Sequence, residues 1–350
     1  MSMTGGIDCD VHVPVPTMAR LSRYLPEVWR EIITARGIYG FAETTLPAKA
    51  PIQARADWRD ADGKASVSLE TLTRAVLDER GMAAAICHCL YPVQKLFDPH
   101  MSAAFASATN EFLAREVLDF DARLYGSVLI SPYHTATAVE EIRRRAADPR
   151  FAQVIMLASA ELPYGDAFYD PIWEAAVAAG MPVALHVGNS GRHPQSATGW
   201  ASYQFEDEVD QSLAFQGQIA SMVSHGVFDR FRDLKIILLG SGVTWLPAFQ
   251  WRFAKFWRGA RIEVPWLTES PIEIIRRHVR VTTQPFDGPG QGIPVGDVLA
   301  HFDAPEMLLY ASDYPRWHFE GTDAFPPGFD ERLRTLAAVE NPRATYGRIQ

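Results

Sequence analysis

Short apolar segments alternate along this chain with longer segments of helical periodicity. The apolar segments are rich in aliphatic and β-branched residues, and several are apolar almost throughout. Continuous apolarity is typical of parallel strands that are covered on both faces. The pattern predicts eight strands, at residues 7–13, 82–90, 124–131, 151–159, 182–188, 234–242, 279–286 and 306–315.

Helices are predicted between these strands. In residues 170–180 we expect Asp170 as the N-cap and Gly180 at the end of the helix. A longer helix is expected from about residue 205 to residue 225. Eight strands with intervening helices favour an α/β fold, a (β/α)8 TIM-like barrel, over an open doubly wound sheet, which remains the alternative.

Two long insertions interrupt this pattern. Residues 37–66 have few periodic apolar positions, and residues 188–204 are rich in Gly, Ser and Asn. Structureless stretches of this length in a compact domain are usually lids or binding loops, unless the assignment of elements is wrong. There is no internal repeat, low-complexity tract or linker, so we expect residues 1–350 to form a single domain.

Composition narrows the class of protein. With 33 basic and 42 acidic residues the formal net charge is -9, and no basic run offsets it, which argues against nucleic-acid binding. No segment approaches the roughly 18 to 20 apolar residues of a membrane helix. The three cysteines cannot form a disulfide framework, and the N-terminus lacks signal-peptide features. We therefore expect a cytoplasmic protein with a small-molecule substrate.

Candidate chemistry gathers at the carboxyl ends of the predicted strands, where barrel active sites lie. Asp8, Asp10 and His12 share one face of the first strand, His186 ends the fifth, and Asp313 ends the eighth. Asp10, His12, His186 and Asp313 form an O/N/N/O set that suits one divalent ion, Zn or Mn. Asp8 either orients one of these ligands or caps the strand.

Three segments carry a family resemblance: IDCDVHV at residues 7–13, GVFDRFRDLKIILLGSGVTWLP at 226–247 and MLLYASDYPRWHF at 307–319. The chain resembles the amidohydrolase superfamily, and in particular the branch that includes aminocarboxymuconate-semialdehyde decarboxylase and the resorcylate-type decarboxylases. The resemblance implies a distorted barrel with inserted loops, one divalent metal and a homodimer. It maps the metal ligands onto Asp10, His12, His186 and Asp313.

One position departs from that branch. Many of its members have a catalytic histidine or glutamate after the sixth strand, where this chain has Gly240. Glycine can neither transfer a proton nor polarise a carbonyl. The loops on the same side offer Arg192, His193, Arg316 and His318 as substrate-binding candidates, although a solvated loop position or a surface ion pair explains each of them as well.

The residues support three functions. The leading one is metal-dependent hydrolysis, with a metal-activated water, Asp313 as the base and His186 beside it as ligand and catalytic residue. The alternative is non-oxidative decarboxylation of a small aromatic or unsaturated acid, in which protonated Asp313 returns a proton to carbon. The third is a barrel that has lost catalysis and only binds a ligand, which Gly240 motivates.

Two further groups have plain structural explanations. Cys87 and Cys89 share one face of the second strand, with His88 on the other, and we expect buried apolar cysteines there. The aromatic residues between Trp245 and Trp257 lie on a predicted helix that is apolar nearly all round, which favours core packing or a subunit interface.

Overall fold

The computed structural model describes residues 3–40, 54–187, 192–288, 295–301, 305–316, 324–326 and 328–349. Eight parallel strands are present within these residues, and their positions agree with the sequence prediction. They are β1 (Gly6–His12), β2 (Met82–His88), β3 (Leu124–Leu129), β4 (Phe151–Leu157), β5 (Val183–His186), β6 (Ile236–Leu239), β7 (Val279–Thr282) and β8 (Leu308–Leu309).

The strands pair in sequence order from β1 to β8. The two ends of the sheet then meet, because the amide of Cys9 donates to the carbonyl of Tyr310 at 2.9 Å and the amide of His12 donates to that of Tyr314 at 2.8 Å. This closure confirms the (β/α)8 barrel and excludes the open sheet. The barrel is distorted, as the family resemblance implied, because β8 is only two residues long and the pairing of β1 with β2 contains register shifts.

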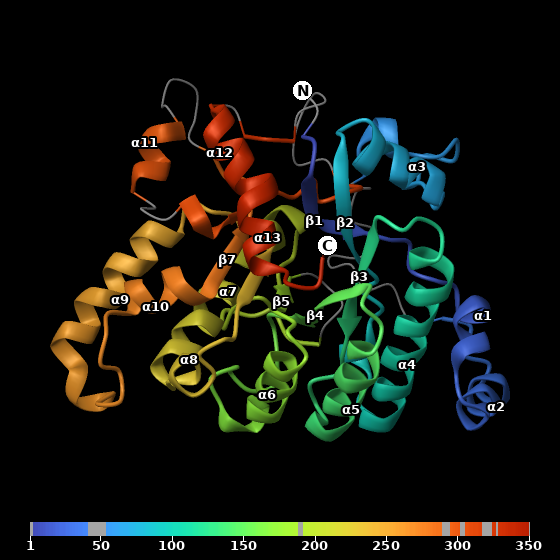
Figure 1. Ribbon diagram of the computed structural model, residues 1–350. Coiled ribbons are helices and arrows are strands. Elements are labelled where there is room, and N and C mark those ends of the chain that lie inside the picture. Colours follow the sequence, from blue (N-terminus) through green and yellow to red (C-terminus); the bar gives the residue numbers. More distant parts are fainter. Residues whose placement is uncertain are drawn as a thin grey trace.

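Helices surround the barrel, and α4, α5 and α6 lie next to one another on its outside (Figure 1). The α-helices are α1 (Met18–Leu21), α2 (Glu27–Arg36), α3 (Leu69–Thr73), α4 (Pro99–Phe112), α5 (Thr135–Ala146), α6 (Asp170–Ala178), α7 (Gln204–Ser224), α8 (Val227–Arg230), α9 (Leu246–Ala260), α10 (Pro271–His278), α11 (Val295–Ala300), α12 (Glu331–Thr335) and α13 (Asn341–Thr345).

The expected N-cap of α6 is wrong by one residue. Tyr169 is the N-cap, and Asp170 is the first helical residue. A 3-10 turn at Ala167–Tyr169 leads directly into the helix, so the chain is already helical where the cap was expected. The Asp170 carboxylate instead pairs with Arg230 at 2.8 Å. At the other end, Gly180 adopts a left-handed φ of 63°, as a glycine after a helix commonly does.

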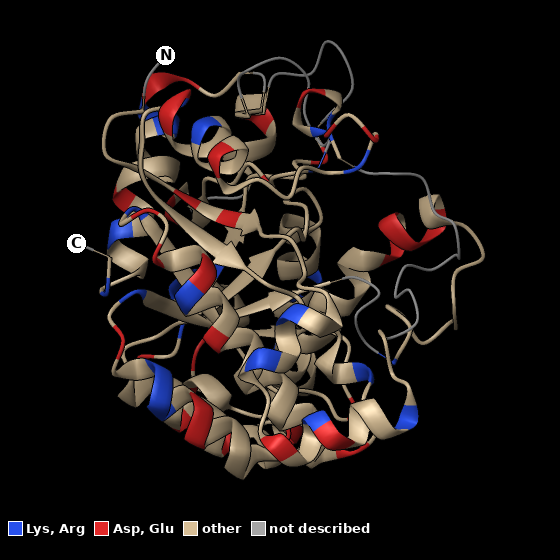
Figure 2. Cartoon of the chain, turned by 90° about the vertical axis from the view of Figure 1, so that its right-hand side faces the viewer, with Lys and Arg blue, Asp and Glu red and all other residues tan. Residues whose placement is uncertain are grey.

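The hydrophobic core fills the barrel and the layer between strands and helices. Every residue of β4 is buried, and β5 and β6 are buried along their whole length. Charged residues lie mainly on the surrounding helices and loops, while the central strands are largely without them (Figure 2). Buried charged groups therefore stand out, because burying a charge is costly unless it is compensated.

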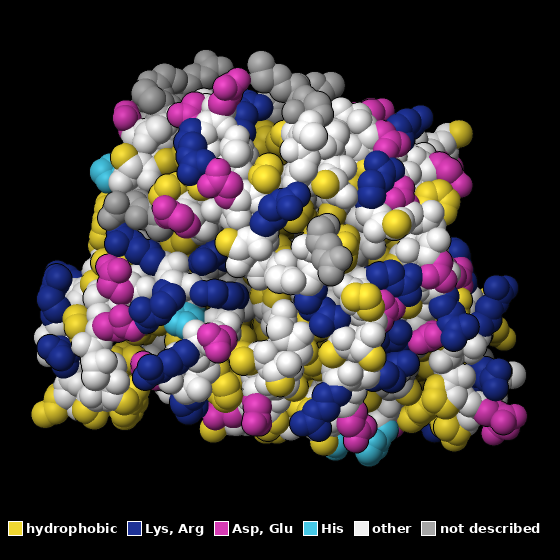
Figure 3. Space-filling model, in the orientation of Figure 1, with side chains coloured by type: hydrophobic (Ala, Val, Ile, Leu, Met, Phe, Trp, Pro, Cys, Tyr) yellow, Lys and Arg dark blue, Asp and Glu magenta, His cyan; other side chains and the backbone are white. Residues whose placement is uncertain are grey.

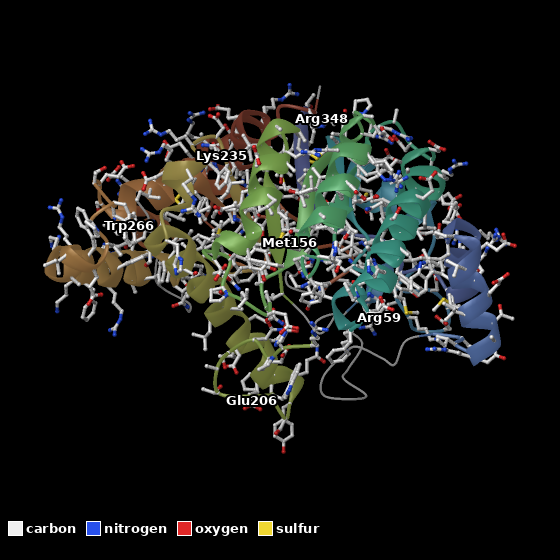
Figure 4. All side chains as sticks on the ribbon, turned by 90° about the horizontal axis from the view of Figure 1, so that it is seen from below. Arg59, Met156, Glu206, Lys235, Trp266 and Arg348 are labelled. Atoms are coloured by element: carbon white, nitrogen blue, oxygen red, sulfur yellow. The ribbon has the colours of Figure 1, made fainter. Side chains whose placement is uncertain are left out.

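The two ends of the barrel differ in what covers them. In Figure 4, Lys235 and Arg348 lie at one end, and Arg59 and Glu206 lie at the other. The first is the amino-terminal end, because Lys235 directly precedes β6. Arg348 closes it by donating to the carbonyls of Phe151 at 2.7 Å and Ala146 at 2.8 Å. At the carboxyl-terminal end, the segments that contain Arg59 and Glu206 lie over the barrel.

The first long insertion belongs to this carboxyl-terminal end. Its described parts are residues 37–40 and 54–66, and the second is not structureless: Ala54 pairs with Arg316, and the amide of Arg55 donates to the carbonyl of Pro315 at 2.9 Å. Trp58 also packs on Tyr314, with ring centroids 4.8 Å apart. Long-range pairing thus holds this segment against the chain that follows β8.

The prediction that the aromatic residues of α9 pack in the core is confirmed for only some of them. Phe249 and Phe253 pack against the core, whereas Trp251 and Phe256 are 53% and 56% exposed. Hydrophobic side chains gather over this region at the lower left of Figure 3, while acidic and basic side chains are interspersed elsewhere on that face. The homodimer and the single domain remain predictions. Among the described helices, none combines the length and apolarity needed to cross a membrane.

Candidate metal centre

The end of β1 supplies two of the predicted ligands. Period-two alternation turns Asp10 and His12 toward the barrel mouth, where His12 Nε2 lies 3.3 Å from Asp10 Oδ1. Asp8, one repeat earlier, is fully buried, and its Oδ1 accepts hydrogen bonds from the amides of Ser312 at 3.0 Å and Asp10 at 3.3 Å. Asp8 thereby ties the backbone before Asp313 to the backbone at Asp10.

The ends of β5 and β8 bring in the other two. The rings of His12 and His186 meet edge to face, with centroids 4.9 Å apart. Asp313 Oδ1 lies 3.1 Å from His12 Nε2. Asp313 has a left-handed φ of 50°, a conformation that Asp tolerates better than most residues. Ligand atoms of Asp10, His12 and His186 all lie within 4.8 Å of one another, close enough to share one metal ion.

These atoms have unmet bonding capacity. Both carboxylate oxygens of Asp10, Nε2 of His12 and Nδ1 of His186 are buried, and within the described chain no hydrogen bond of good geometry reaches them. Buried polar atoms without partners are rare and costly in folded proteins. A divalent ion would satisfy oxygen and nitrogen atoms together, so the residues present fit the group that the family resemblance implies.

The pKa values of the clustered side chains also support a cation site. Burial lowers the pKa of His186 to about 3, which keeps its imidazole neutral as a metal ligand must be. Burial and the nearby Asp313 act to raise the pKa of Asp10, but the imidazoles of His12 and His88 outweigh them and hold it below its usual value. Burial acts to lower the pKa of His12, yet the Asp10 and Asp313 carboxylates raise it to about 9. The pocket therefore attracts positive charge.

Sequence reasoning missed a fifth residue of this cluster. His88, at the end of β2, is fully buried, and its Nε2 lies 3.3 Å from Asp10 Oδ1. The pairing of β1 with β2 sets His88 directly beside His12. The alternation that places Cys87 and Cys89 on one face was the available signal, since it turns His88 to the other face, into the barrel. The two cysteines are buried, and burial raises the pKa of Cys89 to about 12, so they are inert apolar residues.

Arg316 is the substrate-binding candidate that reaches this cluster. Its Nε lies 3.7 Å from Asp313 Oδ1, and its side chain lines a cavity of about 440 Å³ beside His12. Most other residues of the cavity are apolar or small, and Lys64 adds a second cation: the lining is His12, Val13, Pro14, Val15, Ala54, Lys64, Ala65, Ser66, Val67, Pro315 and Arg316. The described part of the first insertion thus forms one wall.

The structure gives Arg192 and His193 different surroundings. Arg192 forms an ion pair with Glu161 and lies over the ring of Tyr133, 4.1 Å from its centroid. His193 Nε2 lies 3.4 Å from the same Glu161 carboxylate and lines a separate cavity of about 640 Å³. Neither contacts the candidate ligands among the interactions of the described residues. His318 lies outside the described residues.

Gly240 follows β6 with a left-handed φ of 71°, which glycine adopts without strain. Its amide donates to Thr282 Oγ1 at 3.0 Å, and a Cβ added there would meet no described atom within 4 Å. The space for a side chain therefore exists after β6, and this chain does not use it.

The fold and this polar cluster define a barrel of the amidohydrolase type with a candidate metal centre. The chain belongs to the amidohydrolase family, whose model, described as Amidohydrolase, matches residues 7–348.

Solved structures with the same fold include two decarboxylases. The 5-carboxyvanillate decarboxylase of Sphingomonas paucimobilis is 22% identical, with 98% of each chain covered and a TM-score of 0.65. A dihydroxybenzoic acid decarboxylase of Polaromonas sp. JS666, solved with manganese and 2-nitroresorcinol, is 19% identical over 99% of this chain and 98% of that chain, with a TM-score of 0.65. An amidohydrolase of Mycobacterium avium subsp. paratuberculosis K-10 is 19% identical over 99% and 100%, with a TM-score of 0.72.

Proposed function

We propose that this protein is a metal-dependent, non-oxidative decarboxylase of a small aromatic or unsaturated carboxylic acid. The observation that carries the proposal is the buried Asp10, His12, His186 and Asp313 cluster, which meets at His12 a cavity bearing the cations of Arg316 and Lys64. Because solved structures with the same fold include decarboxylases of aromatic acids, we reverse the order of the functions expected from the sequence and place hydrolysis second.

The cavity supports a substrate of this class. Val13, Val15 and Val67 offer apolar walls that suit a ring or an unsaturated chain, and burying such a group is favourable. Arg316 presents a planar guanidinium that can hold a carboxylate through two hydrogen bonds. Because the net charge of the chain is -9, these local cations are needed to admit an anionic substrate.

Asp10, His12, His186 and Asp313 would hold the ion, with manganese or zinc as candidates. The Polaromonas relative contains manganese, which supports the first of these. When bound, the ion would supply positive charge to the substrate carboxylate and to an oxygen beside it. Asp8 would keep Asp10 and the Asp313 segment in register through its two backbone hydrogen bonds.

The chemistry requires one proton transfer. The bond between the ring carbon and the carboxyl carbon breaks, carbon dioxide leaves, and the electron pair stays on the ring carbon. Protonated Asp313 would then deliver its proton to that carbon and be reprotonated from solvent. Hydrolysis needs both activation of water and protonation of a leaving group. With glycine at position 240, a reaction that needs a single proton donor suits the residues better.

The test is to incubate manganese-loaded protein with two substrate panels. Hydroxybenzoic and unsaturated carboxylic acids form the first, and lactones and amides form the second, with metal-free protein as the control. We expect metal-dependent release of carbon dioxide and the matching decarboxylated product from the first panel. Release of titratable acid from the second panel, without carbon dioxide from the first, would contradict the proposal in favour of hydrolysis.

A further inference from the structure

A chain of buried side chains runs through the barrel interior to His88. The hydroxyl of Tyr346 donates to Gln153 Oε1 at 3.0 Å, and Gln153 Nε2 donates to Ser127 Oγ at 3.0 Å. Ser127 Oγ lies 2.7 Å from His88 Nδ1. All four residues are at most 1% exposed. They come from β2, β3, β4 and the end of α13, so the chain connects the C-terminal segment to the candidate metal centre.

The contact with Asp10 favours one direction for this chain when the His88 imidazole is neutral. His88 Nε2 lies 3.3 Å from Asp10 Oδ1, and an ionised carboxylate can only accept a hydrogen bond. Nε2 must therefore carry the proton if the contact is to be favourable, and a neutral imidazole then has a lone pair at Nδ1. Ser127 donates its hydroxyl proton to that lone pair and accepts from Gln153. Each donor in the chain then faces an acceptor.

We propose that the Tyr346–Gln153–Ser127 chain holds His88 in the Nε2–H form, so that His88 positions the metal-binding carboxylate of Asp10. The inference rests on the metal site of the proposed function. His88 is a positioning residue and not a ligand, since its Nδ1 is held by Ser127 and its Nε2 faces the Asp10 carboxylate at 3.3 Å. The contact lacks the geometry of a good hydrogen bond, but an N–H that faces a ligating carboxylate at this distance commonly sets the orientation and basicity of that ligand.

The opposite arrangement makes a different prediction. If His88 Nε2 were a metal ligand, it would present a lone pair, and Nδ1 would donate its proton to Ser127. Ser127 Oγ would then accept from both His88 Nδ1 and Gln153 Nε2, and the Ser127 hydroxyl proton would have no acceptor in this chain. The two arrangements therefore differ in which ring nitrogen of His88 carries the proton.

The first experiment reads that proton directly. Nitrogen-15 NMR of histidine-labelled protein, metal-free and loaded with diamagnetic Zn²⁺, distinguishes the two tautomers, and the H88Q variant assigns the His88 signal. We expect the Nε2–H form in both states. The Nδ1–H form in the Zn²⁺-loaded protein would overturn the proposal.

The second experiment measures Mn²⁺ dissociation constants by electron paramagnetic resonance. We expect His88→Phe to weaken binding about 10- to 100-fold, the usual range for such partners of metal ligands. His88→Gln, which keeps an amide N–H near the place of Nε2, should recover part of that loss. Cys87→Ala is the matched control, because it truncates a buried neighbour on the other face of β2 and should leave Mn²⁺ binding unchanged.

A double-mutant cycle separates positioning from general damage. Ser127→Ala should weaken Mn²⁺ binding in the natural protein and have no further effect once His88 is Phe, since it acts through His88. Equal effects of Ser127→Ala in both backgrounds would overturn the proposal, as would unchanged Mn²⁺ binding in His88→Phe. Thermal unfolding of each metal-free variant checks that it folds.

The two proposals can fail separately. Mn²⁺ affinity and the tautomer are measured without substrate, so a protein that binds Mn²⁺ as described but releases no carbon dioxide refutes only the decarboxylase. Carbon dioxide release with an Nδ1–H His88 refutes only the positioning role.

Discussion

Ionisable side chains converge at the ends of β1, β2, β5 and β8, whereas the residues directly after β6 are glycine and serine. On the first side, His12 lies within 3.3 Å of both Asp10 and Asp313. On the second side, Gly240, Ser241 and Gly242 line a cavity of about 350 Å³, whose carboxylates come from Glu208 in α7 and Asp287 after β7.

This difference indicates that ion binding and proton transfer are carried out by the side chains at the ends of β1, β2, β5 and β8. Under the proposed function, the ion-binding half contains the four candidate ligands, while the other half has Gly240 where many members of the resembled branch have a catalytic side chain. We assign the proposed proton transfer to Asp313 in the ion-binding half, and the carboxylates of Glu208 and Asp287 line the cavity of the other half. Four expected outcomes test this division, in order of decreasing effect.

Removing the metal should have the largest effect. A chelator is expected to abolish carbon dioxide release, and Mn²⁺ should restore it, because the cluster needs a cation to hold the substrate. Mn²⁺ at about 100 times its dissociation constant should also stabilise the fold by about 2.7 kcal/mol, measured by thermal unfolding. Full activity in a protein shown by elemental analysis to be metal-free would contradict the division.

Replacing the proposed proton donor should come next. Asp313→Asn is expected to lower kcat about 10²- to 10⁴-fold at saturating Mn²⁺, the usual contribution of a general acid. Asp287→Asn is a matched control on the other half, since Asp287 also has a left-handed φ, 54° against 50° for Asp313. The measurement is the steady-state kcat of both variants. Equal losses of kcat would show that side chains of both halves take part in proton transfer.

Replacing Arg316 and replacing Arg192 should affect KM differently, with a smaller effect than the loss of Asp313. Arg316→Ala should raise KM about 10- to 100-fold, as expected for losing a charged hydrogen-bonding group of about 1.5 to 3 kcal/mol. Arg192→Ala should change KM little, because Arg192 is paired with Glu161 away from the cluster. The reverse order of KM values would mean that the loop after β5 closes on the substrate.

The smallest effect is expected at Gly240. Gly240→Ala introduces no clash with described atoms, and its positive φ of 71° should cost stability on the order of 1 kcal/mol. We expect kcat within about threefold of the natural protein, because this half supplies no reacting group. A loss comparable to that of Asp313→Asn would place the reaction next to β6.

The fold was largely predictable from the sequence for a physical reason. Strands buried on both faces, such as Phe151–Leu157, must be apolar throughout, and this signal is strong. The two-residue β8 was not predictable in its extent. Its neighbours Tyr310 and Tyr314 close the barrel through backbone contacts with β1, which no local pattern records.

The residues of the candidate site also fall into those that the local sequence predicts and those that depend on long-range contacts. Asp10, His12, His186 and Asp313 were predictable because residues at the ends of parallel strands must converge. The partner of Arg192 was not, since Glu161 lies 31 positions earlier in a separate loop. His88 was not recognised as part of the site, although the alternation that places Cys87 and Cys89 on one face points it into the barrel.

The most direct test of the central claim is a crystal structure of the manganese-loaded protein with anomalous diffraction at the manganese edge. The account predicts one strong peak at coordination distance from Asp10, His12, His186 and Asp313. A peak elsewhere, or none near these four side chains, would contradict it.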